Sequence, residues 1–323
     1  MTDARFITTT VVGFFMIMNC IALPLPVPER GFVSSEPAKT WEEGLICGNG
    51  TIGANALSRP LDERIIFSHE RLFMPMGAPT VPPNQSARLP EIRKLIAEGK
   101  YKEACNLQFE LSGQQGFMYP DFFVPAFDLT IKTEAKGEVR NYARSVNFQT
   151  GETVVHWSDE RGDFQRRMFV SRQDGVAVLL LTAPKPGALD CRLKLEPREP
   201  SDQFNKDSDI SKRSDEMFRE HFGEIRSRAE ESALGFYSRL LRAYPGSIQA
   251  VEGYARVVST GGTRKAEADG ALVVREADEV MLLLDIRLLE DAAQSRAKAM
   301  EESLAALPAD YDGLRRSHAP VSY

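Results

Sequence analysis

Short apolar segments separated by polar turns recur through the middle of the chain, and this rhythm limits the possible fold more than any other feature. The segments lie at 124–132, 139–148, 153–157, 164–171, 176–182 and 189–196. Nothing of helical length separates them, so each strand pairs with the next as an antiparallel neighbour, whereas parallel strands need a helix-length crossover. The sequence therefore predicts a mainly β fold, a large antiparallel β-sandwich (a supersandwich), rather than a parallel α/β sheet.

The Asn49-Gly50 pair predicts a tight hairpin near the start of the sandwich. It lies between two short apolar runs, Leu45-Ile46-Cys47 and Thr51-Ile52, and Asn-Gly is the pair that two-residue hairpin turns favour. The stretch from Gly48 to Gly53 also matches G-x-G-x-x-G, the pattern of a dinucleotide-binding loop. Such a loop must open a helix, and Pro60 follows too soon for one. We therefore interpret these glycines as part of a hairpin.

Three parts of the chain have helical rather than strand-like spacing. A pair of helices is predicted near 90–112, where Pro90 suits a first helical position and Gly99 separates the two helices. An inserted helix is predicted near 212–244, because apolar residues recur there in a charged background. The pattern from residue 288 onward is helical again and predicts a C-terminal helical linker.

The first 26 residues differ in composition from the rest of the chain. Arg5 precedes an apolar stretch that runs from Val11 through Leu23 and is too short for a membrane-spanning helix. A basic residue before a short apolar core is typical of a secretory signal peptide. We therefore predict a signal peptide at 1–26, export to the periplasm or the extracellular space, and no integral membrane span beyond this leader.

Charge and cysteine spacing argue against several kinds of site. The formal net charge is −6 and the basic residues are scattered, which argues against a nucleic-acid partner. The four cysteines form no C-x-x-C pair, so no structural zinc site is expected. Cys47, Cys105 and Cys191 are interpreted as core thiols rather than a disulfide framework. The sequence has no Walker A, G-x-S-x-G or H-E-x-x-H motif, and we predict neither a metal nor a cofactor.

The sequence offers an aromatic loop as a possible contact surface, but no distinctive pair of carboxylates for catalysis. Tyr119, Phe122 and Phe123 lie in a loop with Phe117 and two prolines. Such rings stack on sugars, pack against another domain or fill the end of the sandwich, and the sequence leaves these alternatives open. Glycosidic hydrolysis needs two carboxylates on opposite sides of one bond, and nothing in the sequence marks such a pair. No catalytic residue is therefore predicted in this chain.

Several motifs together resemble the N-terminal domain of family 95 glycoside hydrolases, the α-L-fucosidase type. Trp41-Glu42-Glu43-Gly44-Leu45 and Gly48-Asn49-Gly50-Thr51-Ile52-Gly53-Ala54 are similar to the opening motif of that family. Glu63-Arg64-Ile65 and His69-Glu70-Arg71-Leu72-Phe73 resemble its next motif, and 89–96, 125–129 and 311–314 continue the likeness. The candidates for contact with substrate or with another domain are Trp41, Asn49, His69, Glu70, Tyr119, Phe122 and Phe123.

The resemblance implies an activity and a domain order. It implies an inverting hydrolase that removes terminal α-L-fucosyl or α-L-galactosyl residues, with its acid and base in an (α/α)6 barrel that follows the sandwich. By this likeness, the sandwich domain spans 27–287, and 288–323 form a linker toward a catalytic barrel that is missing from this chain. The expected partners are fucosylated or galactosylated glycans, bound by the whole enzyme, and the catalytic (α/α)6 domain.

Two alternatives without activity are compatible with the same sequence. The first is a stand-alone carbohydrate-binding module, which predicts that the purified chain has measurable affinity for fucose or galactose. The second is a purely structural sandwich that docks on another polypeptide. It predicts an exposed apolar face and self-association of the isolated chain.

Overall fold

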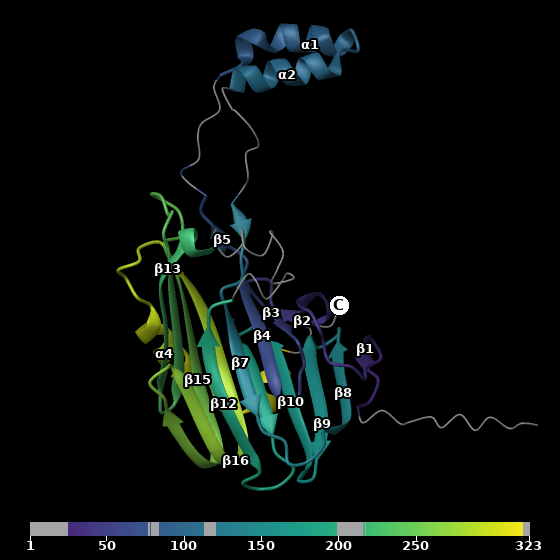
Figure 1. Cartoon of the computed structure of the whole chain (residues 1–323), viewed down its shortest axis with the longest axis vertical. Helices are drawn as coiled ribbons and strands as arrows, with labels where there is room; N and C mark the ends of the chain where they lie inside the picture. The colour runs from purple at the N-terminus through teal and green to yellow at the C-terminus, as the bar shows by residue number, and fades with distance from the viewer. Residues whose placement is uncertain are drawn as a thin grey trace, which may run out of the picture.

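The structure is a computed structural model that describes residues 25–76, 78, 84–112, 121–198, 216 and 218–318 of the 323-residue chain. The predicted signal peptide lies almost wholly outside these residues, as does Tyr119. Figure 1 shows one large sheet that curls around on itself. Within the described residues, no helix is long and apolar enough to cross a membrane.

Antiparallel strands form this sheet, and the predicted mainly β sandwich is confirmed. The strands of the sheet are β1 (Gly31–Ser34), β2 (Leu45–Gly48), β3 (Ile52–Ala56), β4 (Asp62–His69), β7 (Phe127–Thr133), β8 (Arg140–Asn147), β9 (Glu152–Asp159), β10 (Gly162–Val170), β11 (Ala177–Thr182), β12 (Leu189–Glu196), β13 (Phe222–Glu230), β14 (Ala233–Leu240), β15 (Ala250–Ala266) and β16 (Ala271–Leu289). A separate two-stranded ribbon consists of β5 (Phe73–Met74) and β6 (Phe122–Phe123).

The long strand β16 connects the two layers of the sandwich. Its first part, from Ala271 to Ala277, pairs with β12, and its second part, from Glu279 to Leu284, pairs with β11. One layer continues from β12 through β7, β4 and β3 to β2, and the other continues from β11 through β10, β9 and β8 to β1. β15 pairs along the length of β16 and adds β14 and β13 to the second layer.

The bend between the layers has a local cause in the β15–β16 pair. A register shift interrupts this pair between Thr260 and Gly261. Gly261 and Gly262 both have a φ of +69°, and a Cβ on Gly262 would lie 2.1 Å from the carbonyl oxygen of Arg275. A bulge bends its strand and increases the local twist. It therefore turns the sheet where β16 passes from one layer to the other.

A buried ion pair joins the two layers inside the apolar core. Glu63 of β4 contacts Arg166 of β10, and their exposed fractions are 0% and 2%. Glu63 Oε1 also accepts a hydrogen bond from the N–H of Ser58 at 2.8 Å, and Arg166 donates to the carbonyl of Arg59 at 2.9 Å. Burial raises the pKa of Glu63 and lowers that of Arg166, and each charge opposes the effect of burial on the other.

The central strands are apolar on both faces because both faces are covered. In β11, Leu179 points into the sandwich core, whereas Leu180 points outward. Helices α4 (Ala297–Ala305) and α5 (Tyr311–His318) pack on that outer face, where Leu304 is fully buried. The sequence of a strand that is covered on both faces is a continuous apolar run. The predicted C-terminal helices therefore complete a second core.

The helical pair predicted near 90–112 is confirmed as α1 (Leu89–Ala97) and α2 (Tyr101–Ser112). Figure 1 shows this pair set apart from the sheet. The core position expected for Cys105 is wrong, because Cys105 lies on an exposed face of α2, whereas the thiols of Cys47 and Cys191 are buried as predicted. Two short 3-10 helices are η1 (Trp41–Glu43) and η2 (Ser86–Arg88).

The inserted helix predicted near 212–244 is wrong. Where the structure describes this part, it holds the hairpin of β13 and β14, preceded by a helical turn at 218–221. Leu234 and Phe236 of β14 belong to the core, while Arg226 and Arg228 of β13 are more than half exposed. Exposed charges on one face and apolar residues on the other are the pattern of half-buried strands. The charged residues of β13 hid this alternation in the sequence and gave the segment the spacing of a helix.

Candidate functional site

The glycine-rich motif forms the β2–β3 hairpin, as predicted from Asn49-Gly50. Asn49 Oδ1 accepts hydrogen bonds from the N–H groups of Thr51 at 2.9 Å and Ile52 at 2.8 Å. The Nδ2 of Asn49 donates to the carbonyl oxygen of Ser171 at 2.9 Å. Asn49 therefore shapes the turn and ties it to the end of β10.

A cross-strand row of small residues opens a groove on the outer face of the sandwich beside this hairpin. Gly48 of β2 lies opposite Gly53 of β3, and Gly53 lies opposite Ser68 of β4. The row faces outward because the flanking residues Cys47 and Ile52 point into the core. A Cβ on Gly53 would lie 2.7 Å from Ser68 Oγ. The groove has a volume of about 420 Å³.

Aromatic rings and one carboxylate border the groove. Phe148 directly follows β8 and Phe123 ends β6, and their exposed fractions are 65% and 53%. Phe123 packs edge-to-face on Phe73 with ring centroids 5.6 Å apart, and Phe148 packs similarly on Phe32 at 6.3 Å. Glu70 directly follows β4 and is the one carboxylate among the described residues that line the groove. These contacts restrain both exposed rings.

The structure brings only part of the predicted candidate set together. Glu70 and Phe123 line the groove, and Asn49 shapes the turn beside it. Trp41 lies in η1, where it is 42% exposed and does not line the groove. Tyr119 lies outside the described residues.

Two further candidates have local structural roles. The Nδ1 of His69 accepts a hydrogen bond from the N–H of Arg71 at 3.2 Å, and burial lowers the pKa of His69. Phe122 pairs with Met74 in the β5–β6 ribbon and packs against the main core. Neither residue lines the groove in the described structure.

The sequence interpretation missed two prominent groove residues, Phe148 and Ile46. Ile46 is 70% exposed on β2, and Phe148 lies in the turn after β8. An exposed large apolar residue is unremarkable alone, but several around one groove indicate a contact surface. The sequence signal for Phe148 is a phenylalanine inside the polar turn Asn147-Phe148-Gln149-Thr150-Gly151.

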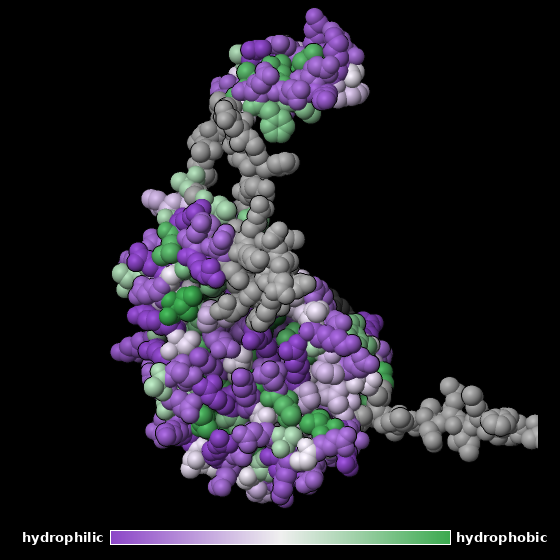
Figure 2. Space-filling view, viewed as in Figure 1, coloured by the Kyte–Doolittle hydropathy of each residue, from purple (hydrophilic) through white to green (hydrophobic). Residues whose placement is uncertain are grey.

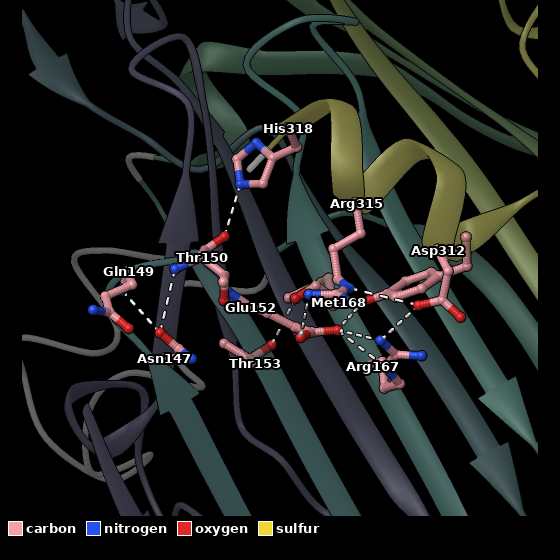
Figure 3. A network of polar contacts seen from close by, with 11 residues as sticks. Asn147, Gln149, Thr150, Glu152, Thr153, Arg167, Met168, Asp312, Arg315 and His318 are labelled. Atoms are coloured by element: carbon pink, nitrogen blue, oxygen red, sulfur yellow. Dashed lines mark hydrogen bonds and ion pairs between the residues drawn. The ribbon is translucent and has the colours of Figure 1, made fainter. Parts of the chain in front are cut away.

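A polar network fastens helix α5 to β9 and β10 (Figure 3). Arg167 of β10 lies 2.9 Å from Glu152 and 3.0 Å from Asp312, and its guanidinium lies 4.4 Å from the ring centroid of Tyr311. The hydroxyl of Tyr311 donates to Glu152 Oε1 at 3.0 Å. Burial beside Glu152 raises the pKa of Tyr311 well above its ordinary value, so this hydroxyl remains a donor.

The other end of α5 lies beside the groove. The Nδ1 of His318 accepts a hydrogen bond from the N–H of Arg172 at 3.1 Å. The neutral ring therefore carries its proton on Nε2, which donates to the carbonyl oxygen of Thr150 at 2.8 Å. A Cβ on Gly151, which lines the groove, would lie 3.5 Å from Nε2 of His318. The end of α5 thus contacts the turn that borders the groove (Figure 3).

Protonation of His318 is expected to weaken the attachment of α5. Burial lowers the pKa of His318, so its neutral form stabilises the fold above the ordinary value of about 6.5, and this contribution is lost as the pH falls through the lowered value. We expect urea unfolding to give a smaller free energy at about pH 5 than at about pH 7.5, and this difference to shrink in His318→Gln. An equal pH difference in the variant contradicts this role.

The groove lacks a pair of catalytic carboxylates among its described residues, because Glu70 is the single one. Two-carboxylate hydrolysis needs another acid across the scissile bond.

Elsewhere, the buried Asp128 lies 3.2 Å from Arg64 and 3.1 Å from Arg198, and burial raises its pKa to about 6. In the part of the chain that the structure describes, no group of three His, Cys, Asp or Glu residues is placed to hold a metal ion.

Comparison with known proteins gives a family and two similar proteins. The family model described as "Glycosyl hydrolase family 65, N-terminal domain" matches residues 32–288. "Alpha-L-fucosidase 2" of Arabidopsis thaliana is 28% identical over 165 residues, which make up 50% of this chain and only 19% of that protein. A solved structure, "Putative kojibiose phosphorylase from human microbiome", is similar with a TM-score of 0.46 and 9% identity, covering 91% of this chain and 37% of the other.

Proposed function

Because this chain belongs to the glycosyl hydrolase family 65 N-terminal domain family, we propose that it is the non-catalytic sandwich domain of a family 95 α-L-fucosidase-type enzyme. The whole enzyme removes terminal α-L-fucosyl or α-L-galactosyl residues with inversion. The observation that carries the proposal is the likeness, over half of the chain, to the plant protein named Alpha-L-fucosidase 2.

The division of labour follows from the chemistry of inversion. A general acid protonates the leaving oxygen, while a general base activates a water on the opposite face of the sugar. The two carboxyl groups lie about 6.5–9.5 Å apart to leave room for that water. Glu70 is the one carboxylate among the described residues that line the groove, which supports a binding role for this domain. We assign the acid and base to an (α/α)6 domain.

The helices α4 and α5 act as the connection to that catalytic domain. We assign 27–287 to the sandwich, 288–323 to the linker and 1–26 to a signal peptide that directs export to the periplasm or the extracellular space. The contacts of Arg167 and His318 hold α5 in one orientation, which supports the assignment of 288–323 as a linker.

The proposal predicts inversion when the chain is joined to an (α/α)6 catalytic domain of this family. Proton NMR of the digest of an aryl α-L-fucoside should show β-L-fucose first. Slow mutarotation should then give the equilibrium mixture of the α and β anomers. The aryl α-L-galactoside should be cleaved in the same way, and an aryl α-D-glucoside should not. Initial release of α-L-fucose, or cleavage of the glucoside alone, contradicts the proposal.

A further inference from the structure

We propose that the groove beside the β2–β3 hairpin binds one neutral pyranose ring of the glycan. The identity of this ring, a fucosyl or galactosyl residue, rests on the proposed function, whereas the binding site rests on the geometry of the groove. The row Gly48, Gly53 and Ser68 forms its floor across three neighbouring strands. Phe148 comes from the opposite layer, across the edge of β2, while Glu70 and Phe123 come from the β4 side.

The exposed rings suit one face of a sugar. The C–H bonds of a pyranose make part of its surface apolar, and an aromatic face offers an apolar surface of matching size. Phe148 is 65% exposed and touches Phe32 only edge-on, with an interplanar angle of 66°. Most of the Phe148 surface is therefore open to a ligand.

The polar groups of the groove suit hydroxyls. Glu70 supplies carboxylate oxygens, which accept hydrogen bonds, and Ser68 supplies a hydroxyl that donates or accepts. β2 ends the sheet order, so one edge of its backbone faces away from β3 without a strand partner in the described sheet. Gly48 of β2 is exposed and lines the groove, so its backbone is accessible to a ligand there.

Charge and size favour a neutral small ligand over other occupants. Glu70 is the one charged residue among the described residues that line the groove, so an anionic ligand is repelled. A volume of about 420 Å³ lies within the range of about 300–1,000 Å³ that small-molecule sites occupy. The core of a protein–protein interface is depleted of charged residues, and the carboxylate of Glu70 suits a hydroxylated ligand better.

Calorimetry and NMR titration of the full chain with methyl α-L-fucopyranoside test the site directly. We expect a dissociation constant on the order of 1 mM, with shifts of the amide signals of Gly48 and Gly53. Phe148→Ala and Glu70→Gln should each weaken binding about tenfold. Both residues are exposed, so these variants should fold normally. Phe109→Ala and Glu301→Gln, at exposed positions on α2 and α4, are matched controls and should bind as the wild type does.

Three results would overturn the inference. These are the absence of heat and of shifts at tens of millimolar sugar, binding that survives both groove substitutions, and self-association in sedimentation that Phe148→Ala abolishes. The last result would identify the groove as a protein contact instead. This test is separate from the proposed function, because inverting hydrolysis by the joined enzyme requires no affinity of the isolated groove for sugar.

Discussion

Replacing Arg166 with methionine is expected to lower the free energy of unfolding by about 3–5 kcal/mol. Arg166 and Glu63 form an ion pair between the two layers, and neither is more than 2% exposed. The substitution leaves the Glu63 carboxylate buried without its cation. Since domains are stable by about 5–15 kcal/mol, this loss is large enough to unfold part of the population.

Urea unfolding of Arg166→Met and of a matched control measures this effect. Arg140→Met removes an exposed ion pair with Glu138, whose atoms lie 3.1 Å apart, and should cost at most about 1 kcal/mol. The double variant Glu63→Gln with Arg166→Met should recover part of the free energy of unfolding that Arg166→Met loses. The neutral amide of glutamine tolerates burial better than an unpaired carboxylate does. Equal costs for the two arginine variants would show that the buried pair does not join the layers as described.

Truncation of Leu304 to alanine is expected to cost about 2–5 kcal/mol. Leu304 is fully buried on α4 and packs in the second core, which covers the outward side chains of the central strands. The substitution leaves a cavity under the helix and loosens its hold on the sheet. Leu89→Ala, at an exposed position of α1, should change stability by no more than about 0.5 kcal/mol.

Urea unfolding together with binding of a hydrophobic dye checks this prediction. Loosening of α4 should expose the apolar outer face, so Leu304→Ala should bind more dye under native conditions than Leu89→Ala does. Equal stability and equal dye binding in the two variants would show that the packing of α4 on the sheet does not stabilise the fold.

The fold was predictable where one residue pattern decided an element. Turn residues such as Asn49-Gly50 placed the hairpin, and Pro90 with Gly99 placed the pair α1 and α2. The hairpin of β13 and β14 was missed, because Arg226 and Arg228 line its exposed face and obscure the apolar face of the pair. Tertiary contacts alone show that this face joins the core.

The groove was less predictable, because it depends on register between strands. Gly48, Gly53 and Ser68 form one row only once β2, β3 and β4 are paired in the observed register. The segment that the resemblance singled out forms the floor of the groove and includes Glu70. Phe148 lies far from that segment in sequence and reaches the groove through the closing of the sandwich. The polar turn around Phe148 indicates an exposed ring, but it does not show that this ring reaches the groove.

Incubation of the purified chain with an aryl α-L-fucoside tests whether this domain itself cleaves sugars. We expect no release of the phenol above the rate without protein. Release that follows the protein through chromatography and falls in Glu70→Gln would contradict it, because the groove would then be a catalytic centre rather than part of an accessory domain.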